Sequence, residues 1–164
     1  MFYEDLSPYS YSTDLVVPQI EEGIIYERRT SIVNIGWLDN QHPFITGFSS
    51  ELFLDKLFKL YIIQRKNGYR GFHVCQLCHT IKSSSVTLKN KGQEITIDLP
   101  DPMIMEKGGR TALIGSREIL VHNGKGIVYV APNMICHYVA EHNYLPPQEF
   151  IHAVLEINQK YDVV

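Results

Sequence analysis

Two short patterns of metal-binding residue types stand far apart in the chain. The first is Cys75-Gln-Leu-Cys78, and the second is His137-Tyr-Val-Ala-Glu-His142. Two thiolates and two imidazoles form a ligand set that suits tetrahedral Zn²⁺. One ion held by both patterns joins the middle of the chain to its C-terminal region. We therefore predict a zinc site made by Cys75, Cys78, His137 and His142.

The spacing within each pattern sets the geometry that the fold must supply. The tight turn of a CxxC motif points both sulfur atoms the same way, so both reach one ion. His137 and His142 are five positions apart, and their rings lie about 140° apart on an ideal helix. The His-x₄-His spacing is within the range found in zinc fingers. Both rings can reach one ion if the last helical turn loosens before Asn143.

Three other residues are close enough in sequence to replace one of these ligands. They are His73, His79 and Cys136. Cys136 adjoins His137, and neighbouring residues on a helix point about 100° apart, so both do not easily face one ion. We expect Cys136 to be a buried thiol. The exact membership of the ligand set stays open at this point.

The ligand count favours a structural ion over a catalytic one. Four protein ligands leave no open coordination position. A catalytic version would use three ligands and a water, with Glu141 or another carboxylate as base. The chain has no HExxH motif and no HxE near its CxxC. We predict a non-enzymatic protein with no catalytic residue.

Composition is typical of one soluble globular domain over residues 1–164, with 45% apolar and 20% charged residues. A net charge of −3 argues against a general nucleic-acid binder. No apolar run is long enough for a membrane span, and the N-terminus lacks the regions of a secretory signal. Three cysteines, two of them in one CxxC, favour metal binding in a reducing compartment. We predict a cytoplasmic protein.

The first half of the chain predicts a docked coil, a strand pair and one long helix. Residues 1–20 show little periodicity, but their aromatic side chains favour docking on the body. β-Branched and aromatic runs predict paired strands at 23–28 and 31–37. Apolar residues at helical spacing predict a helix over 50–64, with Ser49 or Ser50 as N-cap and Gly68 as its terminator.

The second half predicts short strands followed by two helices. Ile95, Ile97 and Leu99 alternate with polar residues, as expected of a half-buried strand. Pro132 suits the first turn of a helix. The predicted elements are a strand at 69–74, hairpins at 85–89/94–99 and 118–122/127–131, a loop at 100–116, and helices at 132–142 and 146–160.

Two surfaces are candidates for partner binding. The segment Trp37, Asp39, His42 and Phe44 is denser in large side chains than a simple loop needs, and Trp37 could anchor a protein partner. Core packing is the alternative use of Trp37 and Phe44.

A second surface flanks the cysteine pair and could bind RNA or DNA, with a solvated hairpin face as the alternative. Its residues are Arg65, Lys66, Tyr69, Arg70, Phe72, Lys82, Lys89 and Lys91.

Motifs along nearly the whole chain resemble an uncharacterised bacterial family, a domain of unknown function. They are Glu4-Asp-Leu-Ser-Pro-Tyr9, Gly36-Trp-Leu-Asp39 with His42-Pro-Phe44, Gly71-Phe-His-Val-Cys-Gln-Leu-Cys78, Gly115-Ser-Arg-Glu-Ile119, Val128-Tyr-Val-Ala-Pro132 and His137-Tyr-Val-Ala-Glu-His-Asn-Tyr-Leu-Pro-Pro147. The resemblance implies a small cytosolic protein and supports treating the four metal ligands as a unit. It carries no activity to transfer.

These observations combine into one prediction. The fold is α+β, with a small antiparallel sheet and hairpins, one long central helix, two C-terminal helices and a treble-clef-like zinc knuckle. We predict a protein-interaction module that contains a structural Zn²⁺, such as an inhibitor or immunity protein whose partner is a toxin. The alternatives are a zinc-dependent nucleic-acid-binding regulator and a zinc hydrolase.

Overall fold

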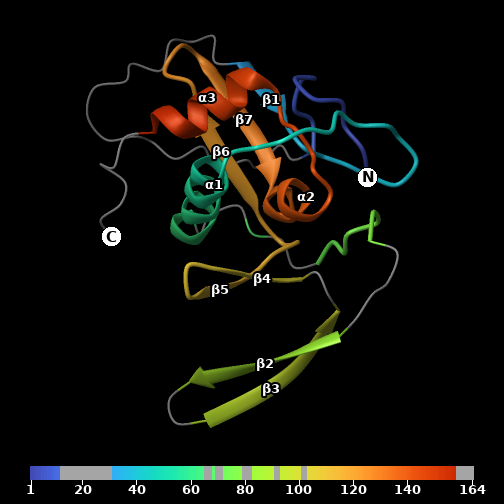
Figure 1. Cartoon of the computed structure of the whole chain (residues 1–164), viewed down its shortest axis with the longest axis vertical. Coiled ribbons are helices and arrows are strands. Elements are labelled where there is room, and N and C mark those ends of the chain that lie inside the picture. Colours follow the sequence, from blue (N-terminus) through green and yellow to red (C-terminus); the bar gives the residue numbers. More distant parts are fainter. Residues whose placement is uncertain are drawn as a thin grey trace.

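A three-stranded sheet with helices on one face forms the centre of the molecule (Figure 1). In this computed structural model the described residues are 1–11, 31–64, 68, 72–78, 83–90, 93–100 and 103–157. The sheet order is β1 (Ser31–Asn34), β7 (Ile127–Pro132) and β6 (Glu118–His122). β6 and β7 form the predicted antiparallel hairpin, whereas β1 runs parallel to β7.

Both faces of this sheet are covered, which explains the continuous apolar runs in β6 and β7. Ile119 and Tyr129 belong to the main core on the helix side. Leu120 and Val130 face the other way and pack with Tyr9 of the N-terminal segment. Because side chains alternate along a strand, two covered faces require apolar residues at every position.

The N-terminal residues 1–11 dock on the sheet as predicted. Tyr3 forms an isolated bridge with Trp37, and Pro8 forms one with Val33. Residues 12–20 lie outside the described part of the chain, and so does the predicted strand at 23–28. The strand predicted at 31–37 is shorter, because the chain leaves β7 after Asn34 and reaches Gly36 at a φ of +67°.

The long helix is α1, Glu51–Ile63, and its N-cap is Ser50, as predicted. The Ser50 hydroxyl accepts a hydrogen bond from the Phe53 amide at 3.2 Å. The helix ends before Gly68, because the Gln64 side chain pairs with the backbone of β6. Its amide donates to the Leu120 carbonyl and its oxygen accepts from the Leu120 N–H, both at 2.8 Å.

Two shorter helices follow β7 and confirm the predicted C-terminal pair. α2 spans Ile135–Glu141 and α3 spans Gln148–Glu156. Pro132 does not begin a helix; it is the last residue of β7, paired with Glu118. Residues 158–164 lie outside the described part. The α+β fold class is therefore confirmed.

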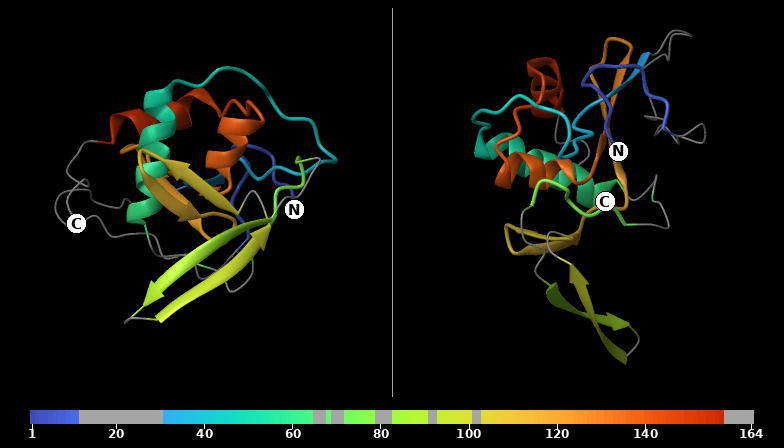
Figure 2. Two further views of the ribbon diagram at one scale, coloured as in Figure 1. Left: turned by 60° about the horizontal axis from the view of Figure 1, so that its bottom comes forward. Right: turned by 90° about the vertical axis from the view of Figure 1, so that its right-hand side faces the viewer.

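Two further hairpins lie beside this body. β2 (Ser83–Asn90) and β3 (Gln93–Pro100) form the predicted pair and project from the body (Figure 2). Ile95 and Ile97 of β3 are 56% and 39% exposed, so the prediction of a half-buried strand was wrong. The described residues place no second layer against this face.

The loop predicted at 100–116 also contains a hairpin, β4 (Ile104–Lys107) with β5 (Arg110–Leu113). Its turn residues Gly108 and Gly109 both have positive φ, as a two-residue hairpin turn of type I′ requires. The strand predicted at 69–74 is absent over residues 72–74, and residues 69–71 lie outside the described part.

Candidate metal centre

The cysteine segment, residues 72–78, is anchored to the strand connection at Gly115. The His73 amide donates to the Gly115 carbonyl at 2.7 Å. Gly115 has a φ of +93°, and a Cβ on it would lie 2.3 Å from the His73 carbonyl oxygen. Only glycine allows this close approach, which fixes the path of the chain two residues before Cys75.

Asn133 links this anchor to the turn that begins α2. Its side-chain oxygen accepts from the Gly115 amide at 2.7 Å. The backbone N–H of Asn133 donates to the Arg117 carbonyl at 2.8 Å. Asn133 is fully buried, and it therefore holds the cysteine segment and the histidine helix in one fixed relation.

The two cysteines share one tight turn. Cys75 is 2% exposed, and the Leu77 amide donates to its Sγ at 3.3 Å. A backbone N–H aimed at sulfur stabilises a thiolate. In the metal-free protein burial is the larger influence, and it raises the pKa of the Cys75 thiol to about 11. A bound cation reverses this preference, because a coordinating thiol gives up its proton.

The end of α2 brings the second histidine back toward the first. The backbone of His142 is no longer helical, with φ −111° and ψ 7°. The next residue, Asn143, is in the left-handed region at φ +52°. The amides of His142 and Tyr144 both donate to the Tyr138 carbonyl, each at 3.1 Å. This confirms the loosened last turn that the His-x₄-His spacing requires.

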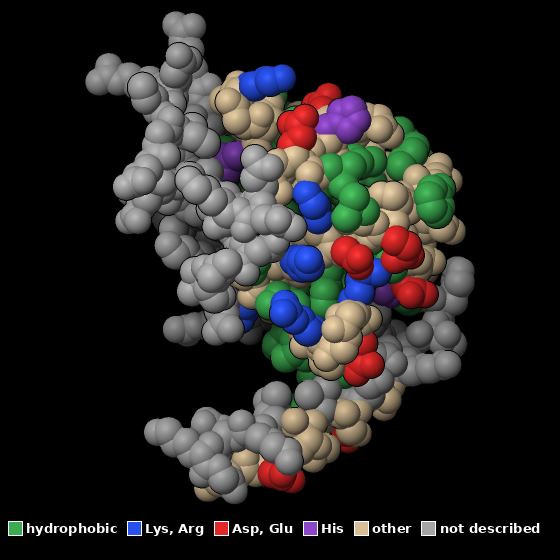
Figure 3. Space-filling model, turned by 60° about the vertical axis from the view of Figure 1, so that its left-hand side comes forward, with side chains coloured by type: hydrophobic (Ala, Val, Ile, Leu, Met, Phe, Trp, Pro, Cys, Tyr) green, Lys and Arg blue, Asp and Glu red, His purple; other side chains and the backbone are tan. Residues whose placement is uncertain are grey.

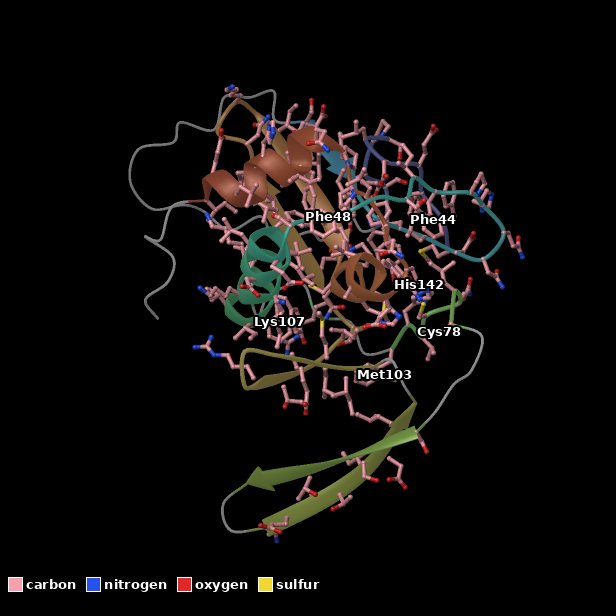
Figure 4. All side chains as sticks on the ribbon, viewed as in Figure 1. Phe44, Phe48, Cys78, Met103, Lys107 and His142 are labelled. Atoms are coloured by element: carbon pink, nitrogen blue, oxygen red, sulfur yellow. The ribbon has the colours of Figure 1, made fainter. Side chains whose placement is uncertain are left out.

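The four predicted ligands meet in space. Figure 4 shows two of them, Cys78 and His142, close together. Their ligand atoms all lie within 4.8 Å of one another. His142 Nε2 is 3.4 Å from Cys75 Sγ and 3.5 Å from Cys78 Sγ. His137 Nε2 is 3.3 Å from Cys78 Sγ and 3.1 Å from His142 Nε2.

These separations fit a tetrahedral ion. Zinc bonds of ~2.3 Å to sulfur and ~2.0–2.1 Å to nitrogen place sulfur and nitrogen ligand atoms about 3.5 Å apart. The same bonds place two nitrogen atoms about 3.3 Å apart. The cluster of Cys75, Cys78, His137 and His142 could therefore hold a metal ion without a large rearrangement.

Of the three possible substitute ligands, His73 and Cys136 lie in the described part of the chain, and neither joins this cluster. Cys136 is fully buried in the core, and burial raises the pKa of its thiol to about 12. None of the three cysteines forms a disulfide. The backbone amide of His73 is bonded to the Gly115 carbonyl, and the His73 ring is not one of the four groups in the cluster. His79 lies outside the described residues.

The segment predicted to bind a partner is mostly engaged within the molecule. Trp37 is 8% exposed, and its indole N–H donates to the Val130 carbonyl. Asp39 accepts from the His42 ring at 2.8 Å, and that ring stacks on Phe2. Phe44 is partly buried against the core. Partner binding by Trp37, Asp39, His42 and Phe44 stays a prediction.

Three exposed apolar side chains just beyond this segment were missed. Phe48 is 87% exposed, Ile45 is 70% exposed and Leu52 is 60% exposed. Leu52 carried one signal in the sequence, since it falls off the apolar stripe of α1. The exposure of Ile45 and Phe48 had no local signal, because loop residues show no periodicity.

The fold and this site define a small α+β protein with a Cys₂His₂ cluster suited to a metal ion. A family described as a domain of unknown function (DUF7919) matches residues 1–155, and the chain belongs to that family. The expectation of an uncharacterised family is thus confirmed. No curated protein and no solved structure matches the chain. Among the described residues, no helix has the length and apolar character of a membrane span.

Proposed function

We propose that this chain is a non-enzymatic interaction protein in which the cluster holds Zn²⁺ as a structural ion. One observation carries the proposal: four ligand atoms from two segments, 59 positions apart between Cys78 and His137, converge within 4.8 Å. The donor set of two sulfurs and two imidazole nitrogens suits zinc better than magnesium or calcium, which take oxygen ligands.

The structural role follows from the ligand count and from the position of the site. Four protein ligands complete a tetrahedron and leave no position for a reacting water. Cys75 and His137 are buried, so the ion would join the cysteine segment to α2 from inside. Such an ion contributes to folding, because the unfolded chain does not hold these ligands together.

The interaction role rests on the surface. Exposed large apolar side chains lie at residues 45–52, next to the segment first considered for partner binding. The specific form we propose is an inhibitor or immunity protein that acts on a bacterial toxin, in keeping with a small acidic chain. The basic residues behind the nucleic-acid alternative mostly lie outside the described residues, namely Arg65, Lys66, Arg70, Lys82 and Lys91.

Metal analysis of purified protein tests the zinc. We expect one zinc per chain in the wild type and less than about half in Cys75→Ser and His142→Ala. Cys136→Ser is the matched control, because it removes a buried thiol outside the cluster. Cobalt replacing the zinc should give the visible absorption of a tetrahedral thiolate site.

A chelator melt tests whether the ion is structural. A ligand whose free concentration is about a thousand times its dissociation constant stabilises the folded state by ~4 kcal/mol. Removing the zinc should therefore lower Tm by roughly 10 °C. A wild type without metal, or one with unchanged Tm after chelation, contradicts the proposal.

A further inference from the structure

A cavity of about 280 Å³ lies between the N-terminal segment, the cysteine segment and the turn that begins α2. These three segments meet on the right of the molecule in Figure 1. The cavity is separate from the Cys₂His₂ cluster, because none of the four cluster residues lines it. Its apolar walls are mainly aromatic. They include Tyr11, Trp37, Leu38, Phe72, Met134 and Tyr138.

The aromatic walls are held in place by the fold. Trp37 is buried, and its indole N–H donates to the Val130 carbonyl at 3.3 Å. The Tyr11 ring packs on Trp37 with their centroids 4.9 Å apart. Tyr138 is buried and Phe72 is 52% exposed, so Tyr138 belongs to the floor of the cavity and Phe72 to its rim. A preformed aromatic cavity binds a flat ring at a low cost in conformational entropy.

Two neutral polar groups also line the cavity, the His73 ring and the Ser116 hydroxyl. Both residues are partly buried. Within the described part of the chain, neither side chain takes part in a hydrogen bond. The bond from the His73 amide to the Gly115 carbonyl fixes the backbone that carries the ring. A ligand with nitrogen or oxygen atoms at its edge would therefore find hydrogen-bond partners here.

One residue of each charge lines the cavity, Arg117 and Glu118. The Arg117 side chain lies against Gly68, where its Cγ and Nε are 3.7 and 3.8 Å from the position of a Cβ. The Glu118 carboxylate is buried and accepts from the Tyr9 hydroxyl at 2.6 Å. The two charges oppose each other, so together they favour neither an anion nor a cation.

A second pair of opposite charges stands at the same end of the molecule. Met1 lines the cavity, and its amino group lies within electrostatic reach of the Asp39 carboxylate. Figure 3 shows basic and acidic side chains mixed on another side of the molecule as well. The charges named here therefore give the cavity no net sign, and we expect no long-range steering of an ion toward it.

We propose that this cavity binds a small uncharged planar compound with heteroatoms at its edge, such as a heteroaromatic base of one or two rings. Its faces stack on the aromatic walls, and its edge atoms bond to His73 and Ser116. The volume is near the lower end of the ~300–1,000 Å³ of small-molecule sites. An ion fits less well, because burying a charge without a partner of its own is costly. This binding site is additional to the metal and interaction roles proposed above and does not rest on them.

The test titrates adenine and benzamide into the zinc-loaded full chain. Trp37 is the only tryptophan of the chain, so its fluorescence reports on the cavity, and saturation-transfer NMR gives a second measurement. We expect saturable binding with dissociation constants of about 1 mM, typical of ligands with about ten non-hydrogen atoms. Three compounds of the size of benzamide should bind at least about fivefold more weakly. They are cyclohexanecarboxamide, which is not planar, and benzoate and benzamidine, which are charged.

Variants of the cavity wall test where the probes bind. Phe72→Ala removes an exposed ring face and should weaken both probes at least about fivefold. Phe48→Ala is the matched control, because it removes an exposed phenylalanine that does not line the cavity. His73→Phe keeps a ring but removes both nitrogen atoms, and it should weaken adenine several-fold.

Several results would overturn this proposal. They are no saturable binding of either probe by both methods, tighter binding of benzoate or benzamidine than of benzamide, equal binding of cyclohexanecarboxamide, or wild-type affinity in Phe72→Ala. Metal content and Tm of Phe72→Ala should equal those of the wild type, because Phe72 is exposed. Failure of the cavity proposal is thereby separated from failure of the zinc proposal.

Discussion

The Nε2 atoms of His137 and His142 lie 3.1 Å apart, although the two residues are separated by more than one helical turn. A regular helix would point these rings about 140° apart. They meet because the chain leaves helical geometry at His142 and turns at Asn143, whose φ is +52°. The Cys₂His₂ cluster therefore depends on how α2 ends as well as on which residues α2 carries.

Replacing Asn143 tests this dependence. Asn143→Ala should lower the free energy of unfolding by about 1 kcal/mol, because Ala adopts the left-handed conformation at about that cost, whereas Asn adopts it more easily. It should also weaken zinc binding by moving His142. Asn143→Gly is the control and should stay close to the wild type. Urea unfolding and zinc titration measure both effects, and equal behaviour of the two variants contradicts the prediction.

Of the glycines that the structure describes, Gly115 should be the least tolerant of substitution. Gly115→Ala would place a Cβ 2.3 Å from the His73 carbonyl oxygen, so the cysteine segment must shift. We expect a loss of more than about 2 kcal/mol and weaker zinc binding. Gly124→Ala has a similar positive φ of +69° but nothing within 4 Å, so it should lose about 1 kcal/mol and keep its zinc affinity. Similar losses in both variants would show that the close contact is unimportant.

Zinc affinity should rise with pH. In the metal-free protein burial raises the pKa of the Cys75 thiol to about 11, so this thiol holds its proton at neutral pH. Binding must displace that proton, and affinity therefore falls about tenfold for each displaced proton as pH drops by one unit. Competition with a chromophoric chelator at several pH values measures the slope. A flat profile between about pH 6 and 8 contradicts ligation by a buried thiol.

Tyr144 ties the N-terminal segment to the end of α2. Its hydroxyl donates to the Asp5 carboxylate, with oxygen distances of 2.8 and 2.9 Å. Tyr144→Phe should lose about 1.5–3 kcal/mol, as expected for a hydrogen bond to a charged acceptor. Tyr138→Phe is the control, because the Tyr138 hydroxyl is 3.5 Å from the Leu38 carbonyl and should contribute less than about 1 kcal/mol. Chemical denaturation of both variants distinguishes these values.

The sequence pattern predicted the elements that are formed by interactions between residues close together in the chain. The apolar stripe of α1 and its Ser50 cap came from helical spacing, and the hairpin of β6 and β7 came from its Asn-Gly turn. The parallel pairing of β1 with β7 joins residues 96 positions apart in the register Ser31 to Ile127, and no local pattern encodes it. The same limit applies to Ile95 and Ile97, whose alternation predicts burial only if another layer covers them.

The sequence by itself determined the ligand chemistry of the candidate metal site, because residue type decides which atoms can ligate. These are two thiols in a CxxC turn and two imidazoles at a known spacing. Only the tertiary structure decided that these four atoms meet within 4.8 Å, and that His73 and Cys136 are left out. The reason is physical, since the meeting depends on long-range contacts such as those of Gly115 with His73 and Asn133. The tertiary structure also decided which apolar side chains face solvent, because exposure depends on what packs against them.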